Sequence, residues 1–324
     1  MQAKQIARRK RKELGQEPPR GYTLRDAWAL WKNLKRGRIV SYQDEKRRME
    51  RYIIGPIGGR QIDEITAPLV IQTVKSIERA GHQATLKRVL MRTREVMDLA
   101  VCAGYIHHNP IDRVSRVFAA PIVKPMPSVH WRELPHVMEI VKSATKRTQL
   151  LFAWACLSLL RPIETVKVRW DWIEDDVLTI PATEMKKSRE HRLPMLPIML
   201  DVLQAAKTES PHPKSPFIWA GRVSGRHMSE QTIAKFFHDT ELKGRLVAHG
   251  IRSIGRSWMA DHDAPFEVAE ACLSHVAGSS VSRAYQRSDY LTQRRTLMAA
   301  WCSYVSDCAR EVGFLPDIFK ADSA

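Results

Sequence analysis

At 324 residues and 44% apolar content, the sequence is too long for one ordinary compact domain and favours two domains, each with its own core. Its net charge of +17 indicates a polyanionic partner, and the excess of basic residues is five in residues 1–20, seven in 21–115 and five in 116–324. No apolar run approaches the roughly 20 residues that span a bilayer. Five cysteines without a CxxC pair favour reduced thiols in a cytoplasmic protein over a disulfide framework or a zinc site.

The first 20 residues form a basic arm. Their sequence, which begins MQAKQIARRKRKELG, lacks the apolar core of a secretory signal. Two interpretations remain open, a solvated tail and an arm that contacts DNA.

Residues 21–115 show four amphipathic patterns joined by short connections, which predicts a helical bundle. The first follows the capping residue Thr23, and the second, over 41–53, is expected to stop at the Gly55-Pro56 pair and the Gly58-Gly59 turn. A capped helix over 66–81 precedes the longest pattern, over 86–104. Basic residues of this last helix are candidate DNA contacts: Lys87, Arg88, Arg92 and Arg94.

Residues 116–128 contain three prolines and little charge, which predicts an extended linker. After it the pattern is mixed. Two short strands are expected at 175–183 and 191–197, on either side of the polar turn 184–190. Helices are expected near 131–144, 147–160, 232–240, 252–261, 266–275 and through 293–305. The apolar residues of the tail, 311–324, could pack on their own domain or dock on a neighbouring copy.

Four short segments carry residues suited to phosphoryl transfer. Arg161 is expected to end an apolar helix with Glu164 one turn later, a pattern that on its own is commonly an ion pair. The turn 184–190 bears lysines, which on their own usually belong to a solvated surface. His249 and Arg252 are three residues apart and would share one helix face, and a His-Tyr pair spaced by ten residues follows them. No segment is specific by itself.

Together these segments match a known pattern. One set of residues resembles, in order and spacing, the active site of tyrosine recombinases, above all the integrases of temperate and satellite phages and genomic islands: Arg161, Lys186, His249, Arg252, His275 and Tyr285. The likeness extends over nearly all of residues 21–310. It implies a mainly α fold with a small β-sheet: a SAM-like helical core-binding domain (21–115), a linker (116–128), a mixed α/β catalytic domain (129–310) and the tail.

The resemblance assigns roles around one phosphate. Arg161 and Arg252 would direct permanently charged forks at its nonbridging oxygens. Tyr285 would be the nucleophile, and because a phenol with a pKa of about 10 is protonated at neutral pH, His249 would accept or relay its proton. His275 would donate a hydrogen bond to the phosphate.

The leaving 5′ oxygen needs a proton. By the resemblance its donor is Lys186, with Lys187 the alternative if the alignment slips by one. Glu164 would support Arg161 or the histidines. Tyr290 is the nearest other candidate nucleophile.

The implied function is that of a site-specific DNA recombinase that forms a 3′-phosphotyrosyl intermediate without metal or ATP, and the sequence has no GxxxxGK[ST] phosphate loop. Its expected partners are double-stranded attachment sites, four copies on two sites, and accessory DNA-bending or excision factors, at the nucleoid of a bacterial or phage-infected cell. An inactive DNA-binding relative, a type IB topoisomerase and, less favoured, an RNA-binding protein are the alternatives. Larger integrases have a further arm-binding domain for which this chain has no room, so it is expected to work without arm sites or to be a shortened relative.

Overall fold

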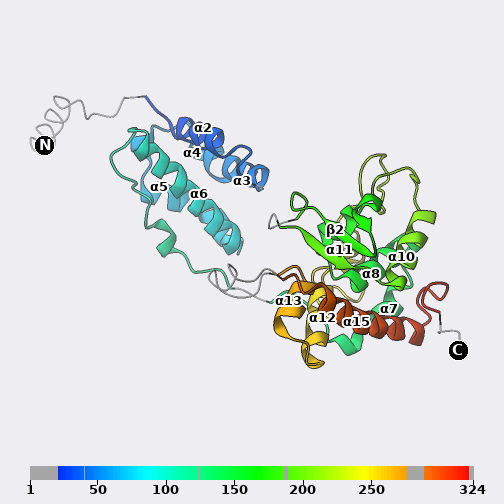
Figure 1. Ribbon diagram of the computed structural model, residues 1–324. Coiled ribbons are helices and arrows are strands. Elements are labelled where there is room, and N and C mark those ends of the chain that lie inside the picture. Colours follow the sequence, from blue (N-terminus) through cyan, green and yellow to red (C-terminus); the bar gives the residue numbers. More distant parts are fainter. Residues whose placement is uncertain (1–20, 40, 123–124, 186–188, 276–287, 321–324) are drawn as a thin grey trace, which may run out of the picture. The chain divides into compact units, whose positions relative to one another are not determined.

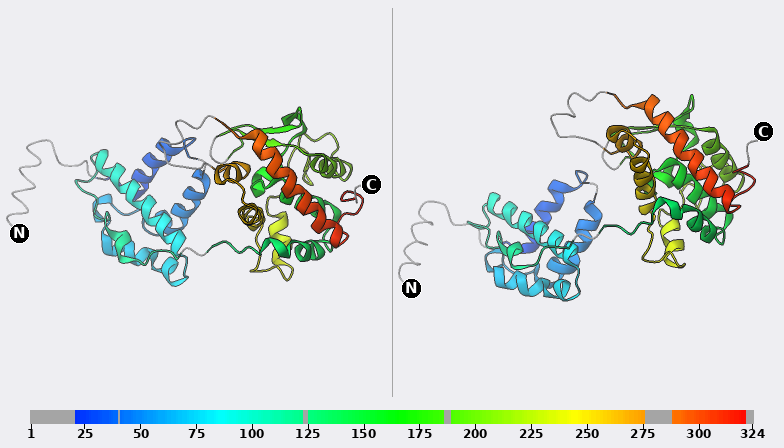
Figure 2. Two further views of the ribbon diagram at one scale, coloured as in Figure 1. Left: turned by 60° about the horizontal axis from the view of Figure 1, so that its bottom comes forward. Right: turned by 90° about the horizontal axis from the view of Figure 1, so that it is seen from below.

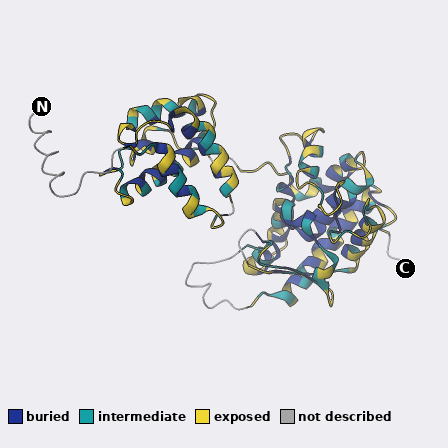
Figure 3. Cartoon of the chain, turned by 90° about the horizontal axis from the view of Figure 1, so that it is seen from above, coloured by how far each residue is buried: buried dark blue, intermediate teal, exposed yellow. Residues whose placement is uncertain are grey.

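The computed structural model describes residues 21–39, 41–122, 125–185, 189–275 and 288–320. The chain divides into two compact units, residues 1–124 and 125–324, and the division falls within the proline-bearing segment after the first bundle. In both units, the buried residues gather in the interior (Figure 3), so each has its own hydrophobic core.

In the described part of unit 1 every regular element is helical. The elements are α2 (Leu24–Lys35), α3 (Tyr42–Met49), the π-helical turn η1 (Glu50–Ile54), α4 (Gly55–Ile57), η2 (Ile62–Glu64), α5 (Ala67–Arg79), α6 (Gln83–Cys102) and η3 (Val114–Val117). The helix start at Thr23 is confirmed: its hydroxyl accepts from the Asp26 amide, and the Asp26 carboxylate accepts from the Thr23 amide at 2.8 Å. The longest of these helices, α6, packs against α2, α3 and α5 (Figure 2).

Of the two predicted stop signals for the second helix, the Gly55-Pro56 pair is wrong and the Gly58-Gly59 turn is confirmed. The backbone continues through the π-helical turn into α4, where Pro56 occupies the first helical turn and needs no amide donor. The helix ends before Gly58, where a Cβ would lie 2.3 Å from the Ile54 carbonyl oxygen. Glycine is therefore required at the second of the two expected signals.

Unit 2 surrounds a small sheet with helices. Its elements are η4 (Trp131–Glu133), α7 (Leu134–Val141), α8 (Lys146–Ser158), α9 (Pro162–Lys167), η5 (Trp170–Trp172), β1 (Ile173–Glu174), β2 (Val177–Ile180), β3 (His191–Pro194), α10 (Pro197–Thr208), α11 (Thr232–His238), α12 (Gly250–Asp261), α13 (Phe266–Cys272) and α15 (Leu291–Glu311). The two predicted strands are confirmed as β2 and β3, which pair antiparallel with Ile180 opposite His191. The short β1 was not expected; it pairs with the other edge of β2.

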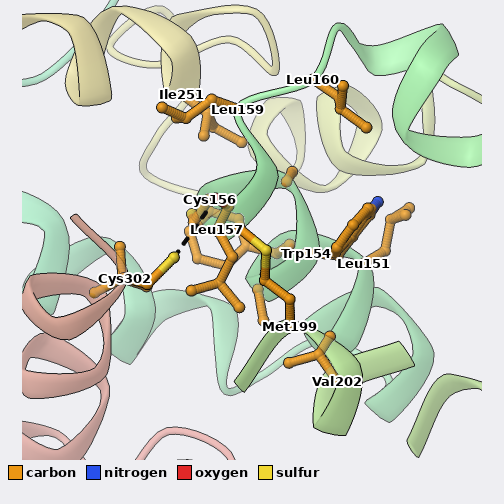
Figure 4. Close-up of a cluster of buried hydrophobic side chains, with 14 of the residues drawn as sticks. Leu151, Trp154, Cys156, Leu157, Leu159, Leu160, Met199, Val202, Ile251 and Cys302 are labelled. Carbon is orange, nitrogen blue, oxygen red and sulfur yellow. Dashed lines mark hydrogen bonds between the residues drawn. The ribbon is translucent and has the colours of Figure 1, made fainter. Parts of the chain in front are cut away.

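Helix α8 forms the middle of this unit (Figure 1). All nine residues from Leu150 to Ser158 are buried, as expected for a helix that is covered on every side. Figure 4 shows Leu151 and Leu157 of α8 among side chains of α10 and α15, with the Cys302 thiol donating to the Leu157 carbonyl at 3.8 Å. Because α8 is fixed from all sides, the loop that follows it starts from a rigid support.

The described part of the tail packs on its own unit. Phe314, Leu315 and Phe319 are at most 3% exposed and join the core of unit 2. Phe314 makes an edge contact with Phe152 of α8 at a centroid distance of 6.1 Å. Of the two interpretations of the tail, the structure therefore supports packing in its own domain, and these apolar side chains are not available to a neighbour.

Candidate active site

Arg161 lies between two helices of unit 2. Helix α8 ends at Ser158, and Leu159 then adopts a left-handed conformation with φ of 52°, which turns the chain. The prediction that Arg161 ends the apolar helix is wrong, because Arg161 is the N-cap residue of the next helix, α9. Its Nη1 donates to Glu164 Oε1 at 2.8 Å, and its own amide donates to Glu164 Oε2 at 3.0 Å. Glu164 thus fixes both the backbone and the guanidinium of a residue that is only 9% exposed.

Arg252 projects from the first turns of α12 and is only 3% exposed. Its Nη1 donates to the Leu159 carbonyl, and its Nη2 donates to the Leu273 carbonyl. Burial, reinforced by repulsion from Arg161, lowers the pKa of Arg252 to about 10. The guanidinium therefore remains charged at neutral pH, and it connects the loops that lead into Arg161 and His275.

His275 completes the cluster. Its Nε2 lies 3.0 Å from Arg252 Nη2, while its Nδ1 lies 2.9 Å from Glu270 Oε2. Burial lowers the pKa of His275, and its hydrogen bond to Glu270 opposes that effect. Just before it, the Ser274 carbonyl accepts from Arg161 Nη2 at 3.2 Å. Arg161, Arg252 and His275, more than 110 residues apart at the extremes, are therefore brought into one connected network.

His249 is on the same helix face as expected, at the N-cap of α12 and three residues before Arg252. This end of α12 is held by the start of unit 2, because Ser128 Oγ donates to the Gly250 carbonyl at 3.0 Å. A Cβ on Gly250 would lie 2.5 Å from the Pro127 carbonyl oxygen, so the close approach requires glycine.

Lys186, Lys187 and Tyr285 lie outside the described residues. The described residues that flank them in the sequence line one pocket of about 240 Å³: Met185 and Arg189, before and after the two lysines, and His275 and Ser288, before and after the segment with Tyr285. Tyr290 lines the same pocket and therefore stays a candidate for the nucleophile.

The sequence did not indicate four further residues at this pocket or in its support. Glu270 contacts His275, and Arg256 in turn donates to Glu270. The spacing of Arg256, four residues after Arg252 on one helix face, could have indicated that Arg256 lies near the site. His191 of β3 and Arg294 of α15 line the pocket and are 5% and 2% exposed. Burial, with Arg294 and Arg252 nearby, holds the pKa of His191 well below its usual range, so this ring is neutral.

The basic residues of α6 belong to unit 1 and differ in their surroundings. Lys87 and Arg88 are exposed. Arg92 is turned inward: it pairs with Glu45 at 3.2 Å and with Glu95, and it lies over the Trp31 ring. Arg94 pairs with Asp112 at 2.7 Å. Only the first two present charge that is not already compensated by a neighbouring carboxylate in the described structure.

Neither a membrane span nor a metal-binding cluster occurs in the described residues. None of the helices there combines the length and the apolar character needed to cross a membrane. The same part of the chain contains no group of three His, Cys, Asp or Glu side chains arranged to hold a metal ion.

Comparison with known proteins identifies the chain. Residues 128–291 match the model of the phage integrase family, and residues 27–117 match that of the phage integrase central domain. The prophage integrase IntA of Escherichia coli K12 is 35% identical over 282 residues, which cover 85% of this chain and 68% of that protein. The integrase of Shigella phage Sf6 is 24% identical over 277 residues, or 84% of this chain and 72% of that one.

Solved structures share the fold. A lambda integrase tetramer bound to a Holliday junction has a TM-score of 0.64 at 16% identity, over 82% of this chain and 78% of that one. The Tn1549 transposon integrase in complex with circular intermediate DNA has a TM-score of 0.60 at 11% identity, over 83% and 100%. The expected fold, a helical core-binding domain and a catalytic domain with a small sheet, is confirmed. The chain belongs to the phage integrase family and is a site-specific recombinase of the tyrosine type.

Proposed function

We propose that this recombinase cleaves and rejoins DNA strands through a 3′-phosphotyrosyl intermediate formed on Tyr285. The observation that carries the proposal is the convergence of Arg161, Arg252 and His275, from three distant segments, in one hydrogen-bonded network, in which the two arginines contact Ser274 and His275 at the edge of the pocket. Two buried guanidinium groups beside each other repel, and this repulsion adds to burial, the larger cause, in lowering the pKa of Arg252. A phosphate between them would relieve that repulsion, which makes the pair a binding site for the scissile phosphate.

The reaction conserves the phosphodiester energy. The Tyr285 Oη attacks phosphorus as its proton passes to His249, and the P–O5′ bond breaks as Lys186 gives a proton to the departing oxygen. Arg161 and Arg252 neutralise the nonbridging oxygens throughout, and His275 donates a hydrogen bond to one of them. A 5′ hydroxyl from another strand then reverses these steps. No hydrolysis of ATP is needed, because the bond energy is kept in the tyrosyl ester.

We further propose that four copies act on two attachment sites, by analogy with the lambda integrase tetramer on a Holliday junction. Unit 1 would contribute nonspecific grip through the exposed Lys87 and Arg88, and accessory DNA-bending or excision factors would set the direction. Contacts of this kind are mostly to phosphates and weaken with salt.

The test is a trapped intermediate. Duplexes are selected from a random pool by binding to the purified chain, and a nick is placed so that the leaving strand diffuses away after cleavage. The wild type should give a denaturation-resistant adduct, Tyr285→Phe none, and Arg161→Ala or Arg252→Ala far less. Tyr290→Phe is the matched control and should keep the adduct. An adduct that persists in Tyr285→Phe and is lost in Tyr290→Phe would refute the assignment of the nucleophile.

A second assay separates recombination from topoisomerase action. Recombination predicts strand exchange between two selected sites on separate duplexes. Relaxation of supercoiled plasmid without any exchange would instead favour the topoisomerase alternative, and DNA binding without an adduct would favour the inactive relative.

A further inference from the structure

Glu270 occupies a position from which it can set the protonation of an active-site ring. It lies in the last turn of α13, five residues before His275, and its side chain is 17% exposed. Its two carboxylate oxygens have different partners. Oε1 accepts from Arg256 Nε at 2.8 Å, and Oε2 lies 2.9 Å from His275 Nδ1.

We propose that Glu270, held by Arg256, is a positioning residue that keeps His275 protonated on Nδ1 and presents Nε2 to Arg252 and the phosphate. This inference rests on the function proposed above, because it concerns how His275 reaches its substrate. It adds two residues, on α12 and α13, to the six that the resemblance implies.

The geometry of the ring supports this assignment. An ionised carboxylate can only accept, so the ring nitrogen that faces Glu270 must carry a hydrogen. Burial acts to raise the pKa of Glu270, but hydrogen bonds from Arg256 and His275 outweigh it, and the net shift is downward. A guanidinium can only donate, so Nε2, at 3.0 Å from Arg252 Nη2, accepts through its lone pair in this contact. The two neighbours therefore require the same tautomer.

The orientation has a consequence for the phosphate. With Nδ1–H committed to Glu270, the neutral ring cannot donate from Nε2, so His275 donates to a phosphate oxygen only when a second proton is added at Nε2, the nitrogen that faces Arg252. The carboxylate also lies on the far side of the ring from the arginines and stabilises that extra charge. A carboxylate that fixes a histidine tautomer in this way is a recurrent means of making one ring nitrogen available for chemistry.

Arg256 connects this support to the site itself. It lies four residues after Arg252 on α12, so one helix supplies both the guanidinium that contacts His275 Nε2 and the guanidinium that anchors Glu270. Its guanidinium also lies over the Phe266 ring, at 5.4 Å from the centroid, at the start of α13. Helices α12 and α13 are neighbours in the fold (Figure 1), and the ion pair of Arg256 and Glu270 joins the two helices.

The rival explanation is that Arg256 and Glu270 only hold two helices together. The discriminating measurement is the tautomer of His275 in the full chain, read from long-range proton–nitrogen correlations of nitrogen-labelled histidine, with His275→Asn used for assignment. The proposal expects Nδ1–H in the wild type and its loss in Glu270→Ala. A wild-type ring protonated on Nε2 alone, without a hydrogen on Nδ1, would overturn the proposal without any variant, so it remains testable even if Glu270→Ala unfolds.

Activity supplies the second readout. Glu270→Ala should slow adduct formation on the nicked duplex by about 10- to 100-fold, the usual effect of losing such a support, while its affinity for the duplex changes less than about threefold. Glu133→Ala is the control, because Glu133 also pairs with an arginine of unit 2, Arg245, at 2.8 Å. Wild-type tautomer and wild-type rate in Glu270→Ala would overturn the proposal. Absence of any adduct in the wild type would instead count against the proposed function, and the tautomer would still decide the role of Glu270.

Discussion

The ion pair of Arg161 and Glu164 offers the sharpest test of how the site is supported. The Glu164 side chain is 0% exposed and that of Arg161 10%, and both carboxylate oxygens are used by Arg161. Glu164→Gln keeps the shape but leaves a buried guanidinium without its counter-charge. Breaking a buried pair from one side costs about 3–5 kcal/mol. Since about 1.4 kcal/mol corresponds to a tenfold change in an equilibrium constant, the lower figure raises the equilibrium constant for local unfolding around this pair by a factor of more than 100.

Hydrogen exchange read by mass spectrometry measures that change within the full chain, because peptides from α8 and α9 report on unit 2 separately from unit 1. The control is Asp171→Asn. Asp171 pairs with Arg169 at the same 2.8 Å, but the two side chains are 60% and 34% exposed, so its loss should cost at most about 1 kcal/mol. If Glu164→Gln accelerated exchange in α8 and α9 no more than Asp171→Asn, the argument that burial makes this pair a support would be refuted.

Three further outcomes follow from the structure. In Gly255→Ala the new Cβ would lie 2.6 Å from Leu159 Cδ2, so we expect unit 2 to lose about 1–3 kcal/mol of stability. Adduct formation should also be slower, because the Leu159 carbonyl holds Arg252. An unchanged melting temperature and an unchanged rate would contradict this. The pKa of buried His191 is far below that of an unfolded histidine, so the unfolded chain takes up a proton that the native chain does not, and the free energy of unfolding should fall as the pH drops below about 6.5. His191→Gln should reduce the slope of this free energy against pH by up to about 1.4 kcal/mol per pH unit. An unaltered slope in urea titrations would count against a neutral His191. Lys87→Ala with Arg88→Ala should weaken duplex binding and lower the salt slope by roughly two, whereas Arg92→Ala should mainly destabilise unit 1; the reverse result in binding and melting assays would exclude the assignment.

The elements that the sequence predicted well are those with a local cause. Helix α6 has a long apolar periodicity, and the hairpin of β2 and β3 has a polar turn between two β-rich runs. The π-helical turn was missed because Gly55-Pro56 is usually a stop, whereas here tertiary packing carries the helix past it. Helix α10 was missed because Pro197 is compatible both with the end of a strand and with the first turn of a helix.

At the site, residue identity could be predicted but its support could not. Charged and imidazole side chains are visible in a sequence, and their order carried the assignment of the family. The acceptors that hold Arg252 are main-chain carbonyls of Leu159 and Leu273, and a backbone oxygen leaves no trace in residue type. The partnership of Glu270 with His275 likewise depends on how the chain leaves α13, where Ser274 adopts a positive φ of 53°.

These carbonyls explain why the cations can be in place before DNA arrives. Arg252 donates to the Leu159 carbonyl, two residues before Arg161, and to the Leu273 carbonyl, two residues before His275. One guanidinium therefore holds the chain segments of both neighbours at a fixed separation. Its proximity to Arg161 is unfavourable in the absence of an anion. Packing around α8 and the carboxylates of Glu164 and Glu270 must offset that repulsion in the folded chain. In the proposed function, the scissile phosphate would meet charges that the protein already holds in position, which is the condition under which electrostatic stabilisation of a transition state is most effective.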